Sequence, residues 1–272
     1  MPDGYGRRVE REKLRSVFDE DADLYDRMRP GYPGGLFDDL ARWTGAGPGA
    51  SVLEIGAGTG QATRSLAARG HRVTAVELGP ALAARARRNL AQYPGVEVVT
   101  ADFERWTPPT TFDLVFAATA FHWLDPRTRA GRAAEALRPG GALAVVSTDH
   151  VAGGSWTPAF CADIQARYER WDPATPPGLR MTEADDVDAL ADLADVAASA
   201  RFGPPATSRH TFTVTYPTAA YLDVLRTYSG HRALPPSARD GLFADIARLI
   251  DTHHDGRVTK RYLNVLAVFP VR

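Results

Sequence analysis

The sequence predicts an α/β fold with a doubly wound, mainly parallel sheet, and three observations lead to this class. Short apolar runs alternate with amphipathic segments between residues 51 and 147, which is the pattern of repeated strand-helix-strand units. The first run, 52–55, leads directly into glycines at positions 56, 58 and 60. The segment 258–269 is apolar almost throughout, which is typical of a strand inside a sheet.

The region before the sheet is expected to be helical. Apolar residues recur with a helical period from Val9 to Met28, and the segment 29–33, which contains two prolines, ends this helix. A second short helix is expected from Leu36 to Trp43. In the alternating region we expect strands at 52–55, 72–77, 96–100, 112–117 and 142–147, and helices at 61–69, 80–90 and 126–137.

The pattern changes after Asp149. We expect helices at 156–171 and 187–198, separated by a proline-rich loop. The segment 207–216 alternates apolar residues with threonines, so it is expected to be a strand with one buried face. Two further helices are expected, through 221–225 and 242–249, before the last strand.

Composition excludes several classes of function. The 272 residues include 44% hydrophobic and 24% charged residues with a formal net charge of -1, so no basic field for nucleic acid or an anionic membrane is expected. A single cysteine, Cys161, excludes an internal disulfide and a multi-cysteine metal site, and no metal site is predicted. The charged N-terminus and the shortness of the apolar run 114–124 favour a cytoplasmic protein. The excess of arginine over lysine indicates a GC-rich, bacterial genome.

The glycine motif carries the first functional signal. It reads Val-Leu-Glu-Ile-Gly-Ala-Gly-Thr-Gly from Val52 to Gly60, and its G-x-G-x-G spacing departs from the dinucleotide fingerprint G-x-G-x-x-G. This motif resembles motif I of the class I S-adenosylmethionine (AdoMet)-dependent methyltransferases. Three later segments resemble the same family in the same order: Ala101-Asp102-Phe103, the strand 112–118, and Leu-Arg-Pro-Gly-Gly-Ala-Leu at 137–143.

The resemblance covers about residues 51 to 147 and implies a specific architecture. We expect a Rossmann-like sheet of seven strands, mostly parallel with an antiparallel C-terminal strand, together with a helical N-terminal segment and a helical cap. The corresponding parts of the chain are 1–48, which closes over the cofactor, 49–149, which binds AdoMet, 150–206, the cap insertion, and 207–272, which completes the sheet and the acceptor pocket.

The resemblance also implies roles for acids at two strand ends. Glu77, at the end of the second strand, would accept hydrogen bonds from the ribose hydroxyls of AdoMet, and the alternative is an ordinary strand-end acid. Asp102 would accept from the adenine amine while Phe103 covers the ring. The alternative for this pair is a turn aspartate beside a core phenylalanine.

Two more segments narrow the resemblance to a branch of the family that acts on small molecules and includes the trans-aconitate methyltransferases. They are Asp-Leu-Tyr-Asp-Arg-Met-Arg-Pro-Gly-Tyr-Pro at 23–33 and Phe-His-Trp-Leu-Asp-Pro at 121–126. By this resemblance Tyr25 and Arg29 close the site, with Arg29 available to the AdoMet carboxylate. The alternative is a helix-face tyrosine and a surface arginine. The implied cofactor-binding residues are Tyr25, Arg29, Glu54, Gly56, Ala57, Gly58, Glu77, Leu78, Asp102, Phe103 and Ala118.

His122 is the best candidate for a general base, because it follows the fourth strand and has a near-neutral pKa. The alternative is a histidine that orients or packs against the cofactor. His150 and His231 are second candidates, whereas His253 and His254 are adjacent and lack ligand spacing. Aromatic residues between 149 and 255 are expected either to line an acceptor pocket or to form the core of the cap: Trp156, Phe160, Trp171, Tyr221 and Tyr228.

The sequence therefore predicts an AdoMet-dependent methyltransferase that methylates an oxygen or a carboxyl group of a small molecule and releases S-adenosylhomocysteine. We expect no nucleic acid or membrane partner, and a monomer or loose homodimer. Two alternatives stay open: an AdoMet-binding homologue that does not transfer methyl, such as a cyclase-like or regulatory protein, and an NAD-type oxidoreductase.

Overall fold

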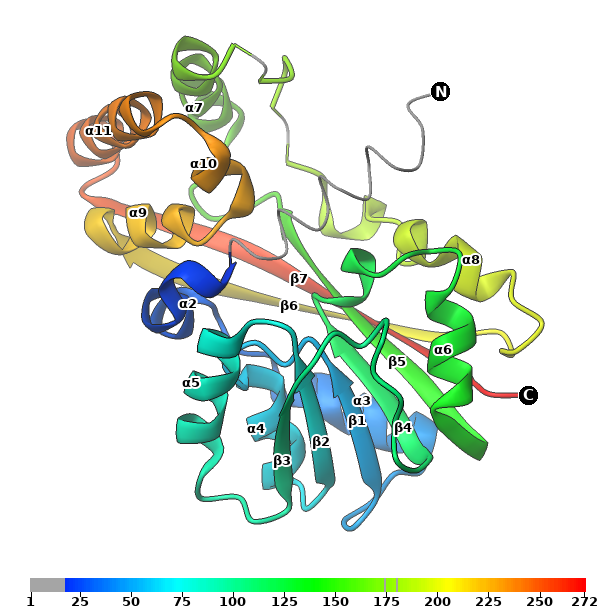
Figure 1. Cartoon of the computed structure of the whole chain (residues 1–272). Coiled ribbons are helices and arrows are strands. Elements are labelled where there is room, and N and C mark those ends of the chain that lie inside the picture. Colours follow the sequence, from blue (N-terminus) through cyan, green and yellow to red (C-terminus); the bar gives the residue numbers. More distant parts are fainter. Residues whose placement is uncertain (1–17, 174, 180) are drawn as a thin grey trace.

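A single mixed sheet organises the molecule (Figure 1). The computed structural model describes residues 18–173, 175–179 and 181–272. The strand order is β3-β2-β1-β4-β5-β7-β6; every pair from β3 to β5 is parallel, and β7 is antiparallel to β5 and to β6. The strands are β1 (Ser51–Ile55), β2 (Arg72–Glu77), β3 (Val96–Thr100), β4 (Phe112–Ala118), β5 (Leu137–Val151), β6 (Ala206–Pro217) and β7 (Arg257–Pro270). The predicted fold class is confirmed.

Helices cover both faces of this sheet. Apolar side chains of α3 and α4 pack on one face, and those of α6 and α8 pack on the other (Figure 1). The helices of this part are η1 (Phe18–Asp21), α2 (Ala22–Met28), α3 (Gly34–Thr44), α4 (Gln61–Ala68), α5 (Pro80–Leu90), η2 (Phe121–Trp123), α6 (Arg129–Glu135), η3 (Ala184–Asp186), η4 (Ala191–Leu193) and α8 (Ala194–Ala197). In the part of the chain that is described, no helix is both long and apolar enough to cross a bilayer.

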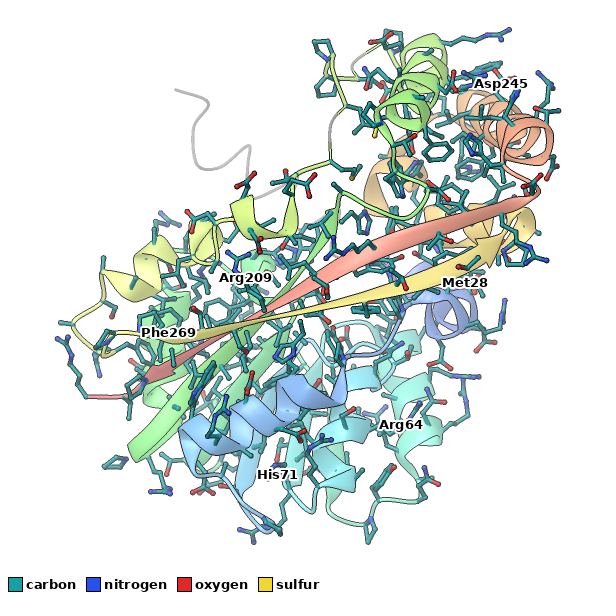
Figure 2. All side chains as sticks on the ribbon, turned by 180° about the vertical axis from the view of Figure 1, so that it is seen from behind. Met28, Arg64, His71, Arg209, Asp245 and Phe269 are labelled. Atoms are coloured by element: carbon teal, nitrogen blue, oxygen red, sulfur yellow. The ribbon has the colours of Figure 1, made fainter. Side chains whose placement is uncertain are left out.

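Four helices form a separate layer over one end of β6 and β7 (Figure 1). They are α7 (Pro158–Trp171), α9 (Thr218–Arg226), α10 (Ser229–Ala233) and α11 (Pro236–His253), and we call them the cap. Asp245 of α11 lies between α11 and α7 (Figure 2), where its carboxylate accepts a 2.8 Å hydrogen bond from the indole of Trp171. Met28 of α2 packs against the same cap core, so the N-terminal helix contacts the cap (Figure 2).

Several predicted elements have the expected bounds. β2 and β3 match residue for residue, and α5 begins at Pro80, whose missing amide hydrogen costs nothing in a first helical turn. β6 alternates between half-buried and exposed residues, as predicted, because it is the edge of the sheet. β7 lies inside the sheet between β5 and β6, which accounts for its apolar sequence.

Other predicted bounds are wrong. The expected helix 187–198 is broken into η4 and α8, because the Asp188 carboxylate accepts a hydrogen bond from the Leu190 amide and forms a turn. The expected helix 126–137 begins only at Arg129, since Asp125 holds the Arg127 amide in a similar turn. β5 is longer than expected because residues 148–151 continue to pair with β7. Of the helix expected from Val9, only the part from residue 18 lies within the described residues, as η1 and α2.

Candidate active site

A cavity of about 340 Å³ opens at the carboxyl ends of the central strands, the edge at which doubly wound sheets bind ligands. Its wall comes from the ends of β1, β2 and β4, from α2 and from the cap. The predicted site residues that line it are Tyr25, Arg29, Gly56, Gly58, Glu77, Leu78, Phe103 and His122. The structure therefore brings residues from five separate parts of the sequence to one cavity.

The glycine loop after β1 has a backbone that side chains would disturb. Gly56 has φ +68°, and a Cβ there would lie 2.5 Å from the Cβ of Ala120. Gly58 has φ +60°, and a Cβ there would contact the ring of Tyr25 at 3.5 Å. Glycine is thus required at Gly56 for both conformation and space. The result is a loop whose bare backbone forms part of the cavity wall.

Glu77 is tied to this loop. Its Oε2 accepts a 2.8 Å hydrogen bond from the amide of Gly58, and its Oε1 accepts one of 2.8 Å from the amide of Gly79. Burial raises the pKa of Glu77, and these two amide donors oppose that shift. Each carboxylate oxygen has a second lone pair, so the group retains capacity to accept from two hydroxyls. The geometry fits a vicinal diol at the cavity wall.

Four predicted cofactor-binding residues are absent from the described lining of this cavity. Glu54 is 2% exposed, and burial raises its pKa to about 8. Asp102 Oδ1 accepts a 3.0 Å hydrogen bond from the amide of Glu104, forming a turn after β3. Ala57 and Ala118 are buried against the α3–α4 face of the sheet. The roles of these four residues stay predictions.

Arg29 joins the cavity wall to the cap. Its guanidinium carbon lies 5.1 Å from the ring centroid of Tyr25 and 4.9 Å from that of Tyr228, and its Nη2 donates a 3.1 Å hydrogen bond to the carbonyl of Thr227. Stacking on two rings fixes the plane of the guanidinium. Arg29 is therefore a positioned cation at the cavity, and it directly follows α2, which is distant in sequence from the rest of the site.

Thr119, directly after β4, was not predicted as a site residue. Its φ of +53° is unusual for a β-branched residue, and such backbone strain costs about 1–3 kcal/mol. The side chain is held by a 2.9 Å hydrogen bond between its hydroxyl and that of Tyr32. Burial raises the pKa of Tyr32, so this phenol stays protonated. Nothing in the amino-acid pattern signals a strained threonine.

His122 lies in η2, and its ring centroid is 5.0 Å from that of Trp123. It is an exposed residue that separates the main cavity from a second one of about 310 Å³. Desolvation of the ring lowers the pKa of His122, which favours the neutral imidazole near pH 7. A neutral imidazole fits either predicted role, so the choice between base and packing residue stays open.

A smaller chamber of about 90 Å³ continues the main cavity toward the cap. The two cavities share Tyr25, Arg29, Thr119, Thr148, His150 and Tyr228. Asn264 Nδ2 donates to Thr148 at 2.7 Å, while its buried Oδ1 has no partner in the described structure. An unpaired buried acceptor favours a ligand or water with a donor hydrogen.

Behind that chamber lies Lys260, which sequence reasoning did not single out. It is 2% exposed, and its Nζ contacts the hydroxyl of Tyr228 at 3.1 Å. A signal was present: the sequence contains only two lysines, and Lys260 stands in the apolar strand β7 of a chain that otherwise uses arginine.

Comparison with known proteins identifies the central part of the chain. Residues 52–141 match the family model described as a methyltransferase domain. A solved structure from Anaeromyxobacter dehalogenans, described as a candidate type II methyltransferase, superposes with a TM-score of 0.60 at 25% identity, over 88% of this chain and 97% of that one. The chain carries a class I, AdoMet-dependent methyltransferase domain.

Curated relatives extend the match only in part. An uncharacterised methyltransferase of Mycobacterium tuberculosis is 34% identical over 136 residues, which are 50% of this chain and 54% of the relative. A trans-aconitate 2-methyltransferase of Rhodopseudomonas palustris is 36% identical over 103 residues, 37% of this chain and 39% of the relative. The chain thus spans about half or less of the length of these relatives. The methyltransferase domain contains the glycine loop and Glu77, whereas the cap lies outside the matched model.

Proposed function

We propose that this protein is an AdoMet-dependent methyltransferase that methylates an oxygen atom of a small molecule. The observation that carries the proposal is the pairing of Glu77 with the glycine loop. The carboxylate and the bare backbone of Gly56 and Gly58 stand on one cavity wall, with φ values that residues with side chains rarely adopt. A nucleoside with a free diol fits this wall by the chemistry of its donors and acceptors.

The residues of the cavity divide into two groups. AdoMet, when bound, supplies a methyl group on a positively charged sulfur. Glu77 would accept hydrogen bonds from the ribose hydroxyls, Phe103 and Leu78 would cover the adenine, and Asp102 would accept from the adenine amine. Tyr25 and Arg29 would close the cavity, with Arg29 donating to the carboxylate of the cofactor.

The second group would orient the acceptor. The smaller chamber is walled by polar side chains from β5, β7 and the cap, among them Thr148, His150 and Tyr228. Holding a nucleophile in line with the methyl carbon and excluding water supplies on the order of 7–11 kcal/mol of barrier lowering. Arg29, stacked between rings of α2 and the cap, would keep the chamber closed to solvent during this step.

The relatives support a small acceptor. The name of the Rhodopseudomonas palustris protein gives trans-aconitate as its substrate, and we propose a small organic acceptor for this chain on that likeness. We propose a monomer or loose homodimer that works in the cytoplasm without nucleic acid. An AdoMet-binding homologue without transferase activity is the second candidate, favoured by the exposed position of His122, the predicted base.

The experiment is an assay of S-adenosylhomocysteine release over a panel of small hydroxyl compounds and carboxylic acids, trans-aconitate included. The proposed function predicts AdoMet-dependent release with at least one member of the panel. AdoMet binding without release from any member would favour the non-transferring homologue. Binding of NAD in place of AdoMet would contradict both the transferase and the non-transferring homologue.

A further inference from the structure

The side chain of Lys260 ends in an aromatic enclosure. Its Nζ lies 5.2–5.8 Å from the ring centroids of Trp156, Tyr221, Tyr228 and Tyr262. It contacts two polar partners, the hydroxyl of Tyr228 at 3.1 Å and Nδ1 of His150 at 3.2 Å. These two polar contacts hold the amine beside His150 and Tyr228 within the enclosure.

In the described part of the chain, this amine forms no ion pair with a carboxylate. Over the described ranges, no salt bridge joins Lys260 to an acidic residue. Buried ammonium groups are normally paired with an acid, because transfer of an unpaired charge from water is costly. The ring faces offset only part of that cost. The site thus favours a neutral amine, which can accept a proton.

The amine is connected to the acceptor chamber. Tyr228 and His150 line both the main cavity and the smaller chamber, and the Tyr228 hydroxyl lies 3.2 Å from Nε2 of His150. Lys260, Tyr228 and His150 therefore form a triangle of polar atoms with two of its three corners at the wall. A proton can pass from the chamber to Lys260 through the Tyr228 hydroxyl without crossing an apolar gap.

We propose that Lys260 acts through Tyr228 to take the proton of a hydroxyl-bearing acceptor, so that the substrate is an alcohol or phenol. This inference rests on the proposed function and deepens it. Tyr228 is the catalytic residue, because it lines the chamber and would contact the acceptor, and Lys260 is a positioning residue that acts through the Tyr228 hydroxyl. A carboxylate acceptor is already ionised and would not need this transfer of a proton to Lys260.

The hydrogen bonds of the triangle define two states. Neutral Lys260 donates to His150 and accepts from the Tyr228 hydroxyl, so the Tyr228 oxygen presents a lone pair to the chamber. Protonated Lys260 donates to both neighbours. Because Nδ1 of neutral His150 then accepts, its Nε2 carries the ring hydrogen, and the Tyr228 hydrogen turns toward the chamber. Only the neutral state of Lys260 is ready to receive a proton from the acceptor.

The step balances as follows. The acceptor hydroxyl passes its proton to the Tyr228 oxygen while the Tyr228 hydroxyl proton passes to the amine of Lys260. The acceptor oxygen forms a bond to the methyl carbon, and the carbon–sulfur bond breaks with its electron pair staying on sulfur. The positive charge lost by sulfur reappears on Lys260, which later releases the proton to solvent.

The expected pH dependence follows from the groups around Lys260. Burial first, and then the charge of Arg29, lower the pKa of Lys260 to about 7, whereas burial and the nearby cations lower that of His150 to about 3. Activity should therefore rise with pH through about 7 and then level. The titratable groups that face the amine are Arg29, His150, Tyr221, Tyr228, His231 and Tyr262.

The first test needs no turnover. Protein labelled with ¹³C at the lysine ε-carbon gives only two lysine resonances, from Lys13 and Lys260, and Lys260→Met assigns them. We expect the Lys260 signal to titrate near pH 7, and Tyr228→Phe to shift its midpoint. A midpoint near 10, the ordinary range of lysine, would overturn the proposal.

The second test is the pH profile of kcat with the phenol or alcohol that releases S-adenosylhomocysteine fastest. Lys260→Met and Tyr228→Phe should each lower kcat by about 10²–10⁴-fold above pH 8 and remove the rise near pH 7. Tyr168→Phe is the matched control, because Tyr168 is a half-buried cap tyrosine bonded to His231 and lies outside both cavity walls. An unchanged profile in Lys260→Met would overturn the proposal. Turnover with carboxylic acids alone would overturn it while leaving the proposed function intact.

Discussion

The guanidinium of Arg29 stacks on the ring of Tyr228 at 4.9 Å, and this contact links α2 to the cap across the mouth of the cavity. The two residues are far apart in the sequence, and both line the main cavity and the smaller chamber. We propose that this pair couples closure of the cofactor site to formation of the acceptor site.

Replacing Arg29 tests this coupling. Arg29→Ala removes a charged hydrogen-bond donor, which contributes about 1.5–3 kcal/mol, so we expect the Kd of AdoMet to rise by about 10–100-fold. Arg27→Ala is the matched control, because Arg27 is an exposed residue of the same helix. Calorimetric titration measures both. Equal affinities in the two variants would show that Arg29 does not contact the cofactor.

Gly56→Ala tests the glycine loop. The new Cβ would lie 2.5 Å from the Cβ of Ala120 on a backbone with φ +68°. We expect a loss of stability of about 1–3 kcal/mol and of most AdoMet binding. Gly131→Ala, in open space on α6, should instead be neutral or stabilising by up to about 1 kcal/mol. Denaturant unfolding compares the two, and equal midpoints would contradict the expected crowding.

The sequence predicts the half of the site built on regular strands. The resemblance to motif I implied roles for Gly56, Gly58 and Glu77, and all three line one cavity because parallel strands end at one edge of the sheet. The smaller chamber was not found in full. It depends on how β5 and β7 extend into the cap and pair, and on the tertiary position of Lys260 behind Tyr228. The periodicity of apolar residues along the sequence does not predict these tertiary contacts.

The broken helix at 187–198 has a similar explanation. Alanines and leucines there have the composition of a helix, but aspartates recur among them. Each aspartate can capture a nearby backbone amide, as Asp188 does with Leu190, and a turn then competes with the helix. The packing of Leu193 and Val196 against the sheet decides between the turn and the helix. A single sequence does not show this packing.

Glu54 should make stability depend on pH. Burial raises its folded-state pKa to about 8, above the unfolded value of about 4.3. Between these values only the folded state holds the proton, so stability falls as pH rises, with a slope of up to about 1.4 kcal/mol per pH unit. Glu54→Gln mimics the protonated form and should flatten this fall. Denaturant unfolding midpoints at pH 5, 6.5 and 8 measure this loss of stability. Glu97→Gln is the control, because Glu97 is exposed. A parallel fall in wild type and Glu54→Gln would assign the effect to other groups.

His122→Ala separates the two roles left open for that residue. We expect AdoMet affinity to be retained and turnover to fall, because an imidazole that packs at the cavity wall helps to exclude water. The rise of activity near pH 7 should persist in this variant, since we assign it to Lys260. If activity of His122→Ala no longer rises near pH 7, His122 is the proton acceptor. If turnover is unchanged, His122 has no role in the reaction. His253→Ala, at the exposed end of α11, is the control.

The most direct test is calorimetric titration of the protein with AdoMet, S-adenosylhomocysteine and NAD, repeated with Glu77→Gln. Glu77 holds the amides of Gly58 and Gly79 and is assigned the ribose diol. We predict one site per chain for AdoMet and its product, no heat with NAD, and a Kd at least about 10-fold weaker in the variant. Binding of NAD but not of AdoMet would contradict the assignment of this cavity. An AdoMet Kd that is the same in wild type and in Glu77→Gln would also contradict it.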